Sequence, residues 1–208
     1  MRDGPSQSPG PDCAEPLAAA VDRVLAECGE TEVAWWVGPT APRGLAAALR
    51  RRGLEESREA MMVRLDAALP AGVAAPPGLV FRGGSAVQGD FAEVMRELGE
   101  EAEAFYRQVV WQAAWPVRVL VGFVEGKPVS AGSLFWDGKF CGLFDMLVLP
   151  GRRRHGVGAA MLRALLELGS AEFGAERFCL SASSQEGARL YERAGFVSVG
   201  SCLCFEKG

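Results

Sequence analysis

The sequence predicts an α+β fold in which helices flank one central, mostly antiparallel sheet. Two turn signals, Glu125-Gly126-Lys127-Pro128 and Asp137-Gly138, separate three apolar runs and so predict consecutive antiparallel strands. After them the hydrophobic spacing alternates between helical and strand-like as far as the C-terminus. The third observation is the transition at Pro150, where an apolar strand runs through three arginines into a helix.

The elements of the main domain follow one another within residues 76–208. Gly99 interrupts the helical spacing between residues 89 and 115, which indicates two consecutive helices, and Pro116 ends the second of them. In chain order the predicted elements are a strand at 79–82, the two helices, strands at 117–124, at 129–136 and up to Pro150, a helix at 157–168, a strand at 177–182, a helix at 185–194 and a strand at 197–205.

The N-terminal third predicts a smaller unit. Residues 1–15 are rich in Pro, Gly, Ser and Asp without periodicity, so we expect a disordered tail. Residues 67–78 are rich in Pro, Gly and Ala and predict a linker, so the N-terminal subdomain with its linker spans 16–75. Between the tail and the linker the spacing predicts a helix at 16–28, a strand at 32–37, a helix at 42–52 and a strand at 60–65.

The composition is that of a soluble globular protein, with 49% hydrophobic and 23% charged residues. A net charge of −4 argues against non-specific nucleic-acid binding, because such a surface needs an excess of Lys and Arg. No apolar run reaches the roughly 18 residues of a membrane span, and the N-terminus lacks the apolar core of a signal peptide. We therefore expect a cytoplasmic protein without a nucleic-acid or membrane partner.

The six cysteines do not follow a metal-site pattern. None belongs to a C-x-x-C pair and no histidine lies near them in sequence, so a zinc site is not expected. We expect free thiols that pack as small apolar side chains.

Gly156-Val157-Gly158, at the start of the helix after Pro150, predicts an anion-binding loop. Glycine has no Cβ, so a ligand can approach the main chain, and the first N–H groups of a helix have no carbonyl partners. The helix dipole and the three arginines, Arg152, Arg153 and Arg154, add positive charge beside those donors. A pyrophosphate would fit such a loop. The alternative is an ordinary strand-to-helix turn with a solvated basic face, and the coincidence of arginines, glycines and a helix start favours the anion site.

Two motifs resemble those of one known family. Val148-x-Pro150-x-x-Arg153-x-x-Gly156-x-Gly158 is similar to the coenzyme A signature of the GNAT N-acetyltransferase superfamily. LSASSQEGARLYERAGF, residues 180–196, is similar to that family's later strand, turn and helix ending in L-Y-x-x-x-G-F, in the A-S-x-x-G variant of actinobacterial-type members. The resemblance covers residues 76–208.

The resemblance implies a fold, a cofactor and a reaction. It implies the GNAT fold, acetyl-CoA as the cofactor, and transfer of an acetyl group to a primary amine of a small molecule or a protein by direct attack on the thioester. Because dimers are common in the family, a homodimer is a further expectation.

The resemblance also implies which residues bind coenzyme A. The strand before Pro150 is expected to splay from the strand at 177–182, which leaves backbone groups for the pantetheine arm. His155, the only histidine, is interpreted as part of the phosphate loop rather than as a base. The implied cofactor-binding residues are Met146, Leu147, Val148, Arg153, Arg154, His155, Gly156, Val157, Gly158, Ala159, Ser184 and Gln185.

Two residues are candidates for catalysis. Tyr191 holds the position of the family's motif tyrosine and is interpreted as the proton donor to the leaving thiolate. The alternative is a core tyrosine on an amphipathic helix. Asp145 precedes the pantetheine-binding segment and is either the general base or a structural hydrogen-bond acceptor, and both interpretations stay open.

The N-terminal subdomain loosely repeats the helix, strand, helix, strand order of the C-terminal half. Gly53-Leu54 corresponds to Gly195-Phe196, and Leu49 stands where Tyr191 would be. We therefore interpret this region as a degenerate partial repeat of the GNAT domain that does not bind coenzyme A itself.

Two other functional classes compete with the enzyme. A non-catalytic acyl-CoA-binding or interaction module is the alternative, and retention of Tyr191 favours the enzyme. A Rossmann dinucleotide enzyme fails because no G-x-G-x-x-G follows the first strand of a βαβ unit. Trp35 and Trp36 either line a pocket for an aromatic or cationic amine or pack the subdomain onto the main sheet.

Overall fold

The computed structural model describes residues 16–29, 33–66, 74–99, 104, 106–107, 111 and 115–207. The predicted tail and residues 67–73 of the predicted linker lie outside the described residues. The chain divides into an N-terminal unit, Met1–Glu59 with Ser201–Gly208, and a main unit, Ala60–Gly200. The proposed domains at 16–75 and 76–208 are a division by ancestry rather than by compactness, and they stay a prediction.

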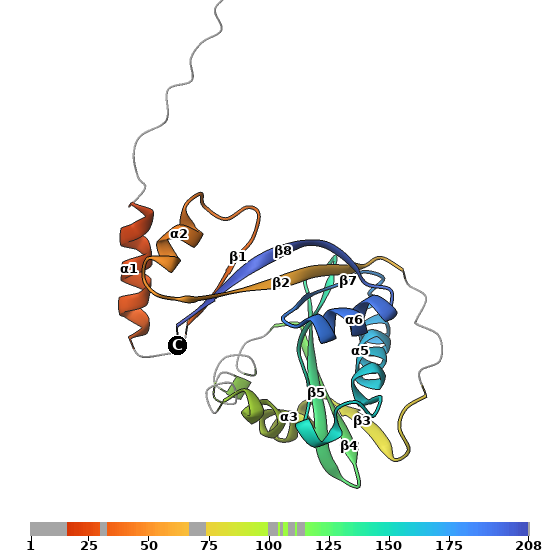
Figure 1. The fold of residues 1–208 in the computed structure, drawn as a ribbon. Coiled ribbons are helices and arrows are strands. Elements are labelled where there is room, and N and C mark those ends of the chain that lie inside the picture. The colour runs from red at the N-terminus through yellow and green to blue at the C-terminus, as the bar shows by residue number, and fades with distance from the viewer. Residues whose placement is uncertain are drawn as a thin grey trace, which may run out of the picture. The chain divides into compact units, whose positions relative to one another are not determined.

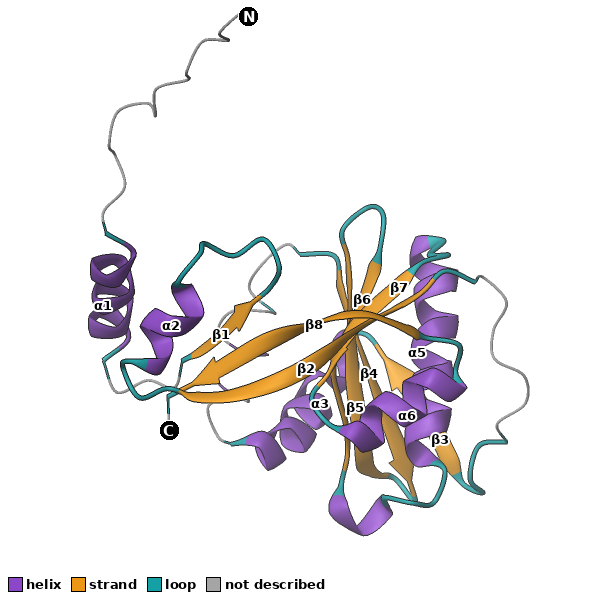
Figure 2. Cartoon of the chain, turned by 45° about the horizontal axis from the view of Figure 1, so that its top comes forward, coloured by secondary structure: helices purple, strands orange, loops and turns teal. Residues whose placement is uncertain are grey.

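The sheet of the main unit has the hydrogen-bonded strand order β2-β7-β6-β5-β4-β3. The pairs β2–β7, β3–β4, β4–β5 and β5–β6 are antiparallel and the pair β6–β7 is parallel, so the predicted α+β class with a mostly antiparallel sheet is confirmed. Figure 2 labels each of these strands. Their bounds are β2 Glu55–Arg64, β3 Leu79–Gly83, β4 Val117–Val124, β5 Lys127–Trp136, β6 Cys141–Val148 and β7 Phe178–Ala182.

Helices cover both faces of this sheet (Figures 1 and 2). The helix α3, Gln88–Met95, packs on one face with a core that includes Phe91, Val119 and Val121. The helices α5, Val157–Phe173, and α6, Gln185–Arg193, lie on the other face, where Leu165 and Phe178 are fully buried. Short 3-10 turns lie at Ser85–Val87, Arg96–Leu98 and Pro150–Arg152.

The predicted elements of the main domain agree with the structure within a few residues. The interruption predicted near Gly99 coincides with the end of the 3-10 turn Arg96–Leu98, after which Gly99 has φ of 121°. Most of the second helix predicted before Trp115 lies outside the described residues. The strand β2 begins at Glu55 rather than at the predicted Ala60. The hydrophobic pattern did not predict the earlier start, because the first four residues are exposed on both faces and show no alternation of apolar and polar side chains.

The parallel strands β6 and β7 separate along their length. Cys141 pairs with Phe178 and Gly142 with Cys179, although β6 continues to Val148 and β7 to Ala182. The predicted splay is therefore confirmed. Beyond Gly142, the β7-facing edge of β6 has backbone groups available to a ligand.

A β-bulge interrupts β6 at Asp145. Two residues of β5, Ala131 and Ser133, pair with Leu147 and Phe144, so β6 has one extra residue between the pairs. Asp145 has φ of 52°, a value that is uncommon for a residue with a side chain. Bulges redirect side chains, and here the bulge gives Asp145 a different environment from that of a regular strand residue.

The N-terminal unit has a small core of its own. It contains α1 (Leu17–Cys28), β1 (Ala34–Val37) and α2 (Leu45–Arg50), and β1 pairs antiparallel with the end of β8 (Val197–Glu206). The buried residues of this core are Val21, Leu45, Ala48, Leu49, Leu54 and Phe205. The predicted helix, strand, helix, strand order is confirmed.

The two tryptophans of β1 have different environments. Trp35 packs against the core of the N-terminal unit, whereas Trp36 is 57% exposed and its Nε1 donates to Glu59 at 3.2 Å. Trp35 is thus a packing residue of its own unit.

Two further findings bear on the composition. The cysteines Cys28, Cys141, Cys179, Cys202 and Cys204 are free thiols, as predicted, and Cys13 lies outside the described residues. Within the described part of the chain, no helix is both long and apolar enough to cross a membrane.

Candidate active site

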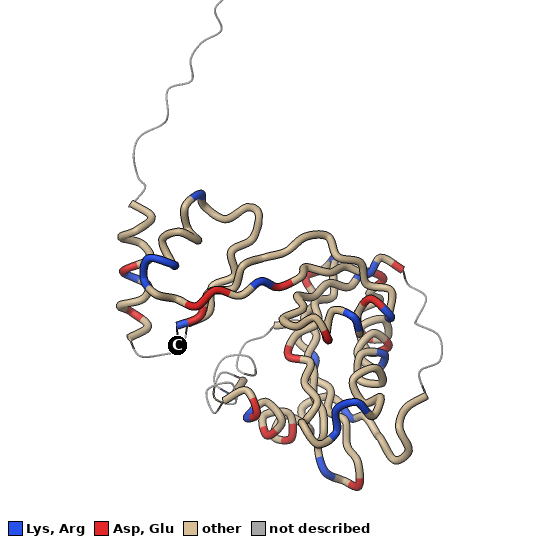
Figure 3. The backbone as a smooth tube through the Cα atoms, in the orientation of Figure 1, with Lys and Arg blue, Asp and Glu red and all other residues tan. Residues whose placement is uncertain are grey.

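A pocket of about 600 Å³, called here the cradle pocket, lies between the start of α6 and the loop that joins β6 to α5. Figure 3 marks the arginines of this loop in blue. The lining residues are Met146, Leu147, Val148, Arg153, Arg154, Gly156, Gly158, Ala159, Ser183, Ser184, Glu186, Gly187, Leu190 and Arg193. The pocket thus joins the splayed end of β6 to the N-terminus of the longest described helix.

Backbone geometry at the start of α5 suits an anion. Arg154 and Gly156 both have positive φ, 66° and 81°, and Gly156 is the N-cap. The bond from Ala160 N–H to Gly156 O, at 3.0 Å, begins the intrahelical ladder. The N–H groups before it have no intrahelical acceptor, and the helix dipole adds partial positive charge at this end.

Side-chain contacts hold the loop in place. Arg153 Nε donates to the carbonyl of Val148 at 2.9 Å, which ties the loop back to β6. Arg154 forms an ion pair with Glu186 of α6 at 2.5 Å, and both side chains are mostly exposed. Because exposed ion pairs stabilise little, this one can exchange for a ligand phosphate at small cost.

The structure brings together nine of the twelve predicted cofactor-binding residues around the cradle pocket. The remaining three lie outside its lining. Val157 is buried, His155 Nδ1 lies 2.6 Å from the carbonyl of Arg153, and Gln185 is exposed on α6. His155 is accordingly a loop residue in this geometry.

Sequence reasoning missed the contribution of α6 to the pocket. Glu186, Leu190 and Arg193 follow one another at four and three residues, which places them on one helix face. That spacing was a usable signal. Ser184, for which a coenzyme contact is predicted, also has a structural role, because its Oγ accepts from Gly187 N–H at 3.1 Å and caps the helix.

Asp145 belongs to a polar cluster on the α3 face of the sheet. Its Oδ2 accepts a hydrogen bond from the hydroxyl of Tyr106 and lies 3.4 Å from Ser133 Oγ. The two hydroxyls lie 3.3 Å apart. The residue is exposed as a whole, but its carboxyl lies among protein atoms, and the resulting desolvation raises the pKa, against the lowering effect of the two hydroxyls. Burial and the neighbouring carboxylate also raise the pKa of Tyr106, so its hydroxyl stays a donor.

Tyr191 lies half-buried on α6, one turn from the cradle pocket. Its ring is within 3.6 Å of the Cβ position of Gly187, a lining residue, and packs edge-on against Phe196 at 5.9 Å between ring centroids. Burial raises the pKa of its phenol to about 12, so the group is protonated at neutral pH. It has the protonation state that a proton donor needs.

Comparisons with solved structures show a shared fold. A protein described as a conserved protein of unknown function from Staphylococcus epidermidis ATCC 12228 is similar in fold, with a TM-score of 0.68 at 14% identity over 91% of this chain and 77% of that chain. A GCN5-related N-acetyltransferase from Kribbella flavida has a TM-score of 0.64 at 18% identity over 92% of this chain and 75% of that one. A tandem GNAT protein from the clavulanic acid biosynthesis pathway has a TM-score of 0.59 at 16% identity over 91% and 67%.

The sequence comparisons differ in outcome. Among curated proteins, no sequence match was found. The model of the acetyltransferase (GNAT) family matches residues 88–196, which is more than half of the chain and includes β6, the arginine loop and Tyr191. The chain therefore belongs to the GNAT acetyltransferase family.

Proposed function

We propose that this protein is an acetyl-CoA-dependent N-acetyltransferase that acts on a primary amine of a small molecule or a protein. The observation that carries the proposal is the splay of β6 from β7, which opens toward the cradle pocket at the N-terminus of α5. An opening with free backbone groups that leads to an anion-binding helix end fits a pantetheine arm, which carries amides along its length and is joined to a pyrophosphate.

The residues present fit coenzyme A in two ways. The edge of β6 from Met146 to Val148 offers backbone groups to the pantetheine amides, as an added strand would receive them. The first N–H groups of α5 and the side chains of Arg154 and Arg193 offer donors and positive charge to the phosphates. When bound, acetyl-CoA supplies the activated acyl group as a thioester.

Two side chains of the protein are assigned to proton transfer. Asp145 accepts a proton from the incoming ammonium, because desolvation makes this carboxylate a stronger base than an exposed one. Tyr191 would give a proton to the sulfur as it leaves, because its phenol is protonated at neutral pH. The second proton that the nitrogen loses on becoming an amide would then restore the phenol. In this assignment Tyr106 and Ser133 are positioning residues that hold the carboxylate of Asp145.

The proposal is tested by isothermal titration of the protein with acetyl-CoA and with coenzyme A, followed by an assay for acetylated amine and free thiol. Binding to both ligands with amine-dependent release of thiol would support an enzyme. Binding without turnover on any amine would favour a non-catalytic acyl-CoA-binding module instead.

Replacing both Arg153 and Arg154 with Ala should weaken coenzyme A binding by about tenfold or more, because charge-assisted contacts to phosphate are each worth roughly 1.5–3 kcal/mol in favourable cases. The double variant also loses the bond that ties the loop to Val148. The measurement is the Kd for coenzyme A, repeated at higher salt, where the difference between variant and wild type should shrink.

Two controls accompany this variant. Arg189→Ala removes an exposed arginine from α6 outside the cradle pocket and should leave the Kd unchanged. Glu186→Gln removes the carboxylate that pairs with Arg154 and should tighten binding. A Kd that ignores the double substitution would refute the cradle as the phosphate site.

Tyr106→Phe should move the acidic limb of the pH profile of kcat/KM to higher pH. The hydroxyl of Tyr106 lowers the pKa of Asp145, so its removal raises that pKa further and the carboxylate forms only at higher pH. The measurement is kcat/KM across pH at saturating acetyl-CoA. An unchanged acidic limb together with unchanged turnover would mean that Tyr106 only fills space in the core.

We also infer that residues 16–65 are a degenerate partial GNAT repeat. Support comes from the turns after α2 and α6: Gly53 and Gly195 have φ of 77° and 88°, and the next residue donates to Leu49 O and Tyr191 O, respectively. The strand pairings match as well. In the repeat β1 corresponds to β7 and β2 to β8; β1 pairs with β8, and β7 pairs with β2, both antiparallel. Homodimerisation and a cytoplasmic location stay predictions.

A further inference from the structure

We infer that the acceptor is an amine with a flat aromatic body, held on an apolar surface that leads to Asp145. This inference rests on the proposed N-acetyltransferase function. The surface consists of Trp115, Val117, Phe135 and Phe144 and is called here the aromatic platform. The observations that support the aromatic platform are independent of the cradle pocket, because none of these residues lines that pocket.

Strand register places Val117 and Phe135 of the platform in one row with Gly142. Val117 of β4 pairs with Phe135 of β5, and Phe135 pairs with Gly142 of β6. Gly142 has no side chain, and the ring of Phe144 covers it, since a Cβ at Gly142 would lie 2.6 Å from Phe144 Cε2. The apolar row therefore continues without a gap across three strands.

The platform lies on the same face of the sheet as Asp145. Ser133 and Phe135 are two residues apart on β5, so their side chains share a face, and Ser133 contacts Asp145 there. The opposite face is filled by α5, as Leu165 packs where a Cβ at Gly132 would lie. A molecule lying on the platform thus has one end beside a carboxylate.

Two large platform side chains are unusually exposed. Phe144 and Trp115 are each 52% accessible to solvent. They belong to one apolar surface through Val117 and Phe135, and a continuous apolar surface marks a binding site more often than single exposed side chains do, because covering it releases water. Phe144 directly precedes Asp145, the candidate base, so this exposed ring lies at the end of the platform where the amine would react.

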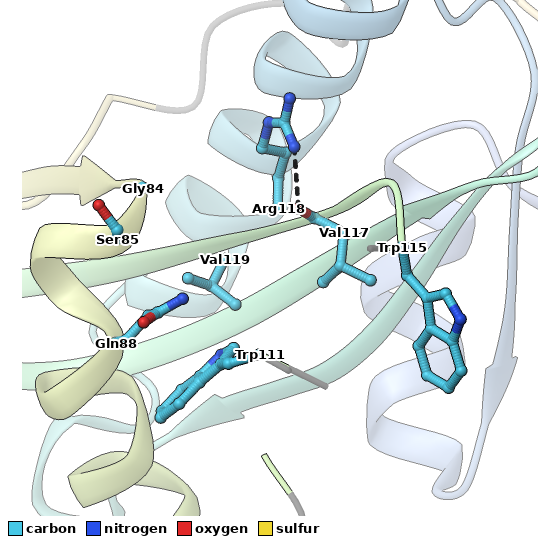
Figure 4. Close-up of a pocket in the computed structure, with 8 residues that line it drawn as sticks. All are labelled: Gly84, Ser85, Gln88, Trp111, Trp115, Val117, Arg118 and Val119. Carbon is cyan, nitrogen blue, oxygen red and sulfur yellow. Dashed lines mark hydrogen bonds between the residues drawn. The ribbon is translucent and has the colours of Figure 1, made fainter. Parts of the chain in front are cut away.

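A pocket of about 330 Å³ continues the surface beyond Val117 (Figure 4). It is lined by Gly84, Ser85, Gln88, Trp111, Trp115, Val117, Arg118 and Val119. In Figure 4 the rings of Trp111 and Trp115 flank Val117, whereas the side chain of Arg118 points away from them. Its volume lies in the range of small-molecule sites.

Charge distinguishes the class of amine. The guanidinium of Arg118 pairs with Glu172 at 3.2 Å, and the described lining contains no carboxylate. A second ammonium on the acceptor would find no carboxylate in this pocket. The guanidinium of Arg107 also places a positive charge there, with Cζ 5.9 Å from the centroid of the Trp111 ring, so a further cation is disfavoured. An aromatic ring would instead pack on the apolar side chains. Trp111 also contacts Tyr106, with ring centroids 6.1 Å apart, so the pocket adjoins the hydrogen-bond partner of Asp145.

The test compares amines as acceptors for the full chain with saturating acetyl-CoA. We expect kcat/KM for 2-phenylethylamine and tryptamine to exceed that for putrescine by about tenfold or more, since aromatic contacts and apolar burial favour the former and the unpaired charge disfavours the latter. Phe144→Ser and, separately, Trp115→Ala should lower kcat/KM for 2-phenylethylamine by about tenfold and for n-butylamine by less than about threefold.

The controls separate this inference from the proposed function. Val80→Ser removes an equally exposed apolar side chain from β3 and should leave every ratio unchanged. Each variant's Kd for coenzyme A reports whether its fold is intact. Equal use of putrescine and 2-phenylethylamine, or ratios unaffected by both platform variants, would overturn the aromatic acceptor while leaving the N-acetyltransferase in place. Coenzyme A binding with no transfer to any amine would overturn both.

Discussion

Asp145→Asn should lower kcat/KM by about a hundredfold or more, the effect expected when a general base is removed from a proton-transfer step. Asparagine has the shape of aspartate and still accepts a hydrogen bond from Tyr106, so the cluster with Ser133 stays intact. What is lost is the capacity to take a proton from the ammonium. Coenzyme A binding should be unchanged, because Asp145 does not line the cradle pocket.

The pH profile tests the same assignment independently. Desolvation raises the pKa of Asp145, so in the wild type kcat/KM should rise with pH as this carboxyl loses its proton. In Asp145→Asn that limb should disappear, and the remaining pH dependence should follow the free amine. A variant that keeps both its rate and its acidic limb would assign Asp145 to structure alone.

Stability provides the control for unfolding. A carboxyl whose pKa is raised by folding contributes stability below its unfolded pKa, and this contribution is lost as the pH rises through the folded pKa. At neutral pH the desolvated carboxylate therefore costs stability, and Asp145→Asn should keep or raise the Tm. A lower Tm would contradict the assigned direction of the pKa shift.

The fold could be predicted largely from local signals. Glu125 and Gly126 both have positive φ, as the predicted turn requires, and the strands on either side pair as a hairpin. The apolar residues of α5 repeat at helical spacing, and Val157, Met161, Leu162 and Leu165 among them are buried. Such signals depend on residues close in sequence. The exposed first half of β2 lacked them and was missed.

The site could be predicted only in part, for a related reason. Its phosphate end is one continuous segment, so Arg153, Gly156 and Gly158 could be read together. The environment of Asp145 depends on Tyr106, 39 residues away, and on Ser133 across a bulge. Nothing in the spacing of these three residues predicts that they meet, because register shifts such as that at Asp145 are set by tertiary packing.

The tryptophans illustrate the same limit. In the sequence the adjacent pair Trp35-Trp36 is a candidate pocket wall, yet Trp35 packs against the core of the N-terminal unit. Trp111 and Trp115, four residues apart, line a pocket together. An exposed tryptophan cannot be distinguished from a buried one without the strand against which it packs.

Tyr191→Phe should lower kcat by about a hundredfold while leaving the Kd for coenzyme A nearly unchanged, as expected for loss of a general acid. Burial raises the phenol's pKa to about 12, so the wild-type group can donate a proton throughout the neutral range. Phenylalanine keeps the edge-on contact with Phe196 and the contact near Gly187, so the ring position should persist. The measurement is kcat with a good acceptor amine at saturating acetyl-CoA.

A change of leaving group distinguishes a proton donor from a packing residue. If Tyr191 protonates the departing sulfur, an acetyl donor whose thiol is more acidic than that of coenzyme A needs less help, and the deficit of Tyr191→Phe should shrink with it. Tyr106→Phe removes a hydroxyl from the other face of the sheet and should show no such dependence, because Tyr106 acts through Asp145 on the amine. A deficit in Tyr191→Phe that is equal for both donors would mean that the phenol positions the acyl group rather than donating its proton, and unaltered turnover would remove it from the mechanism.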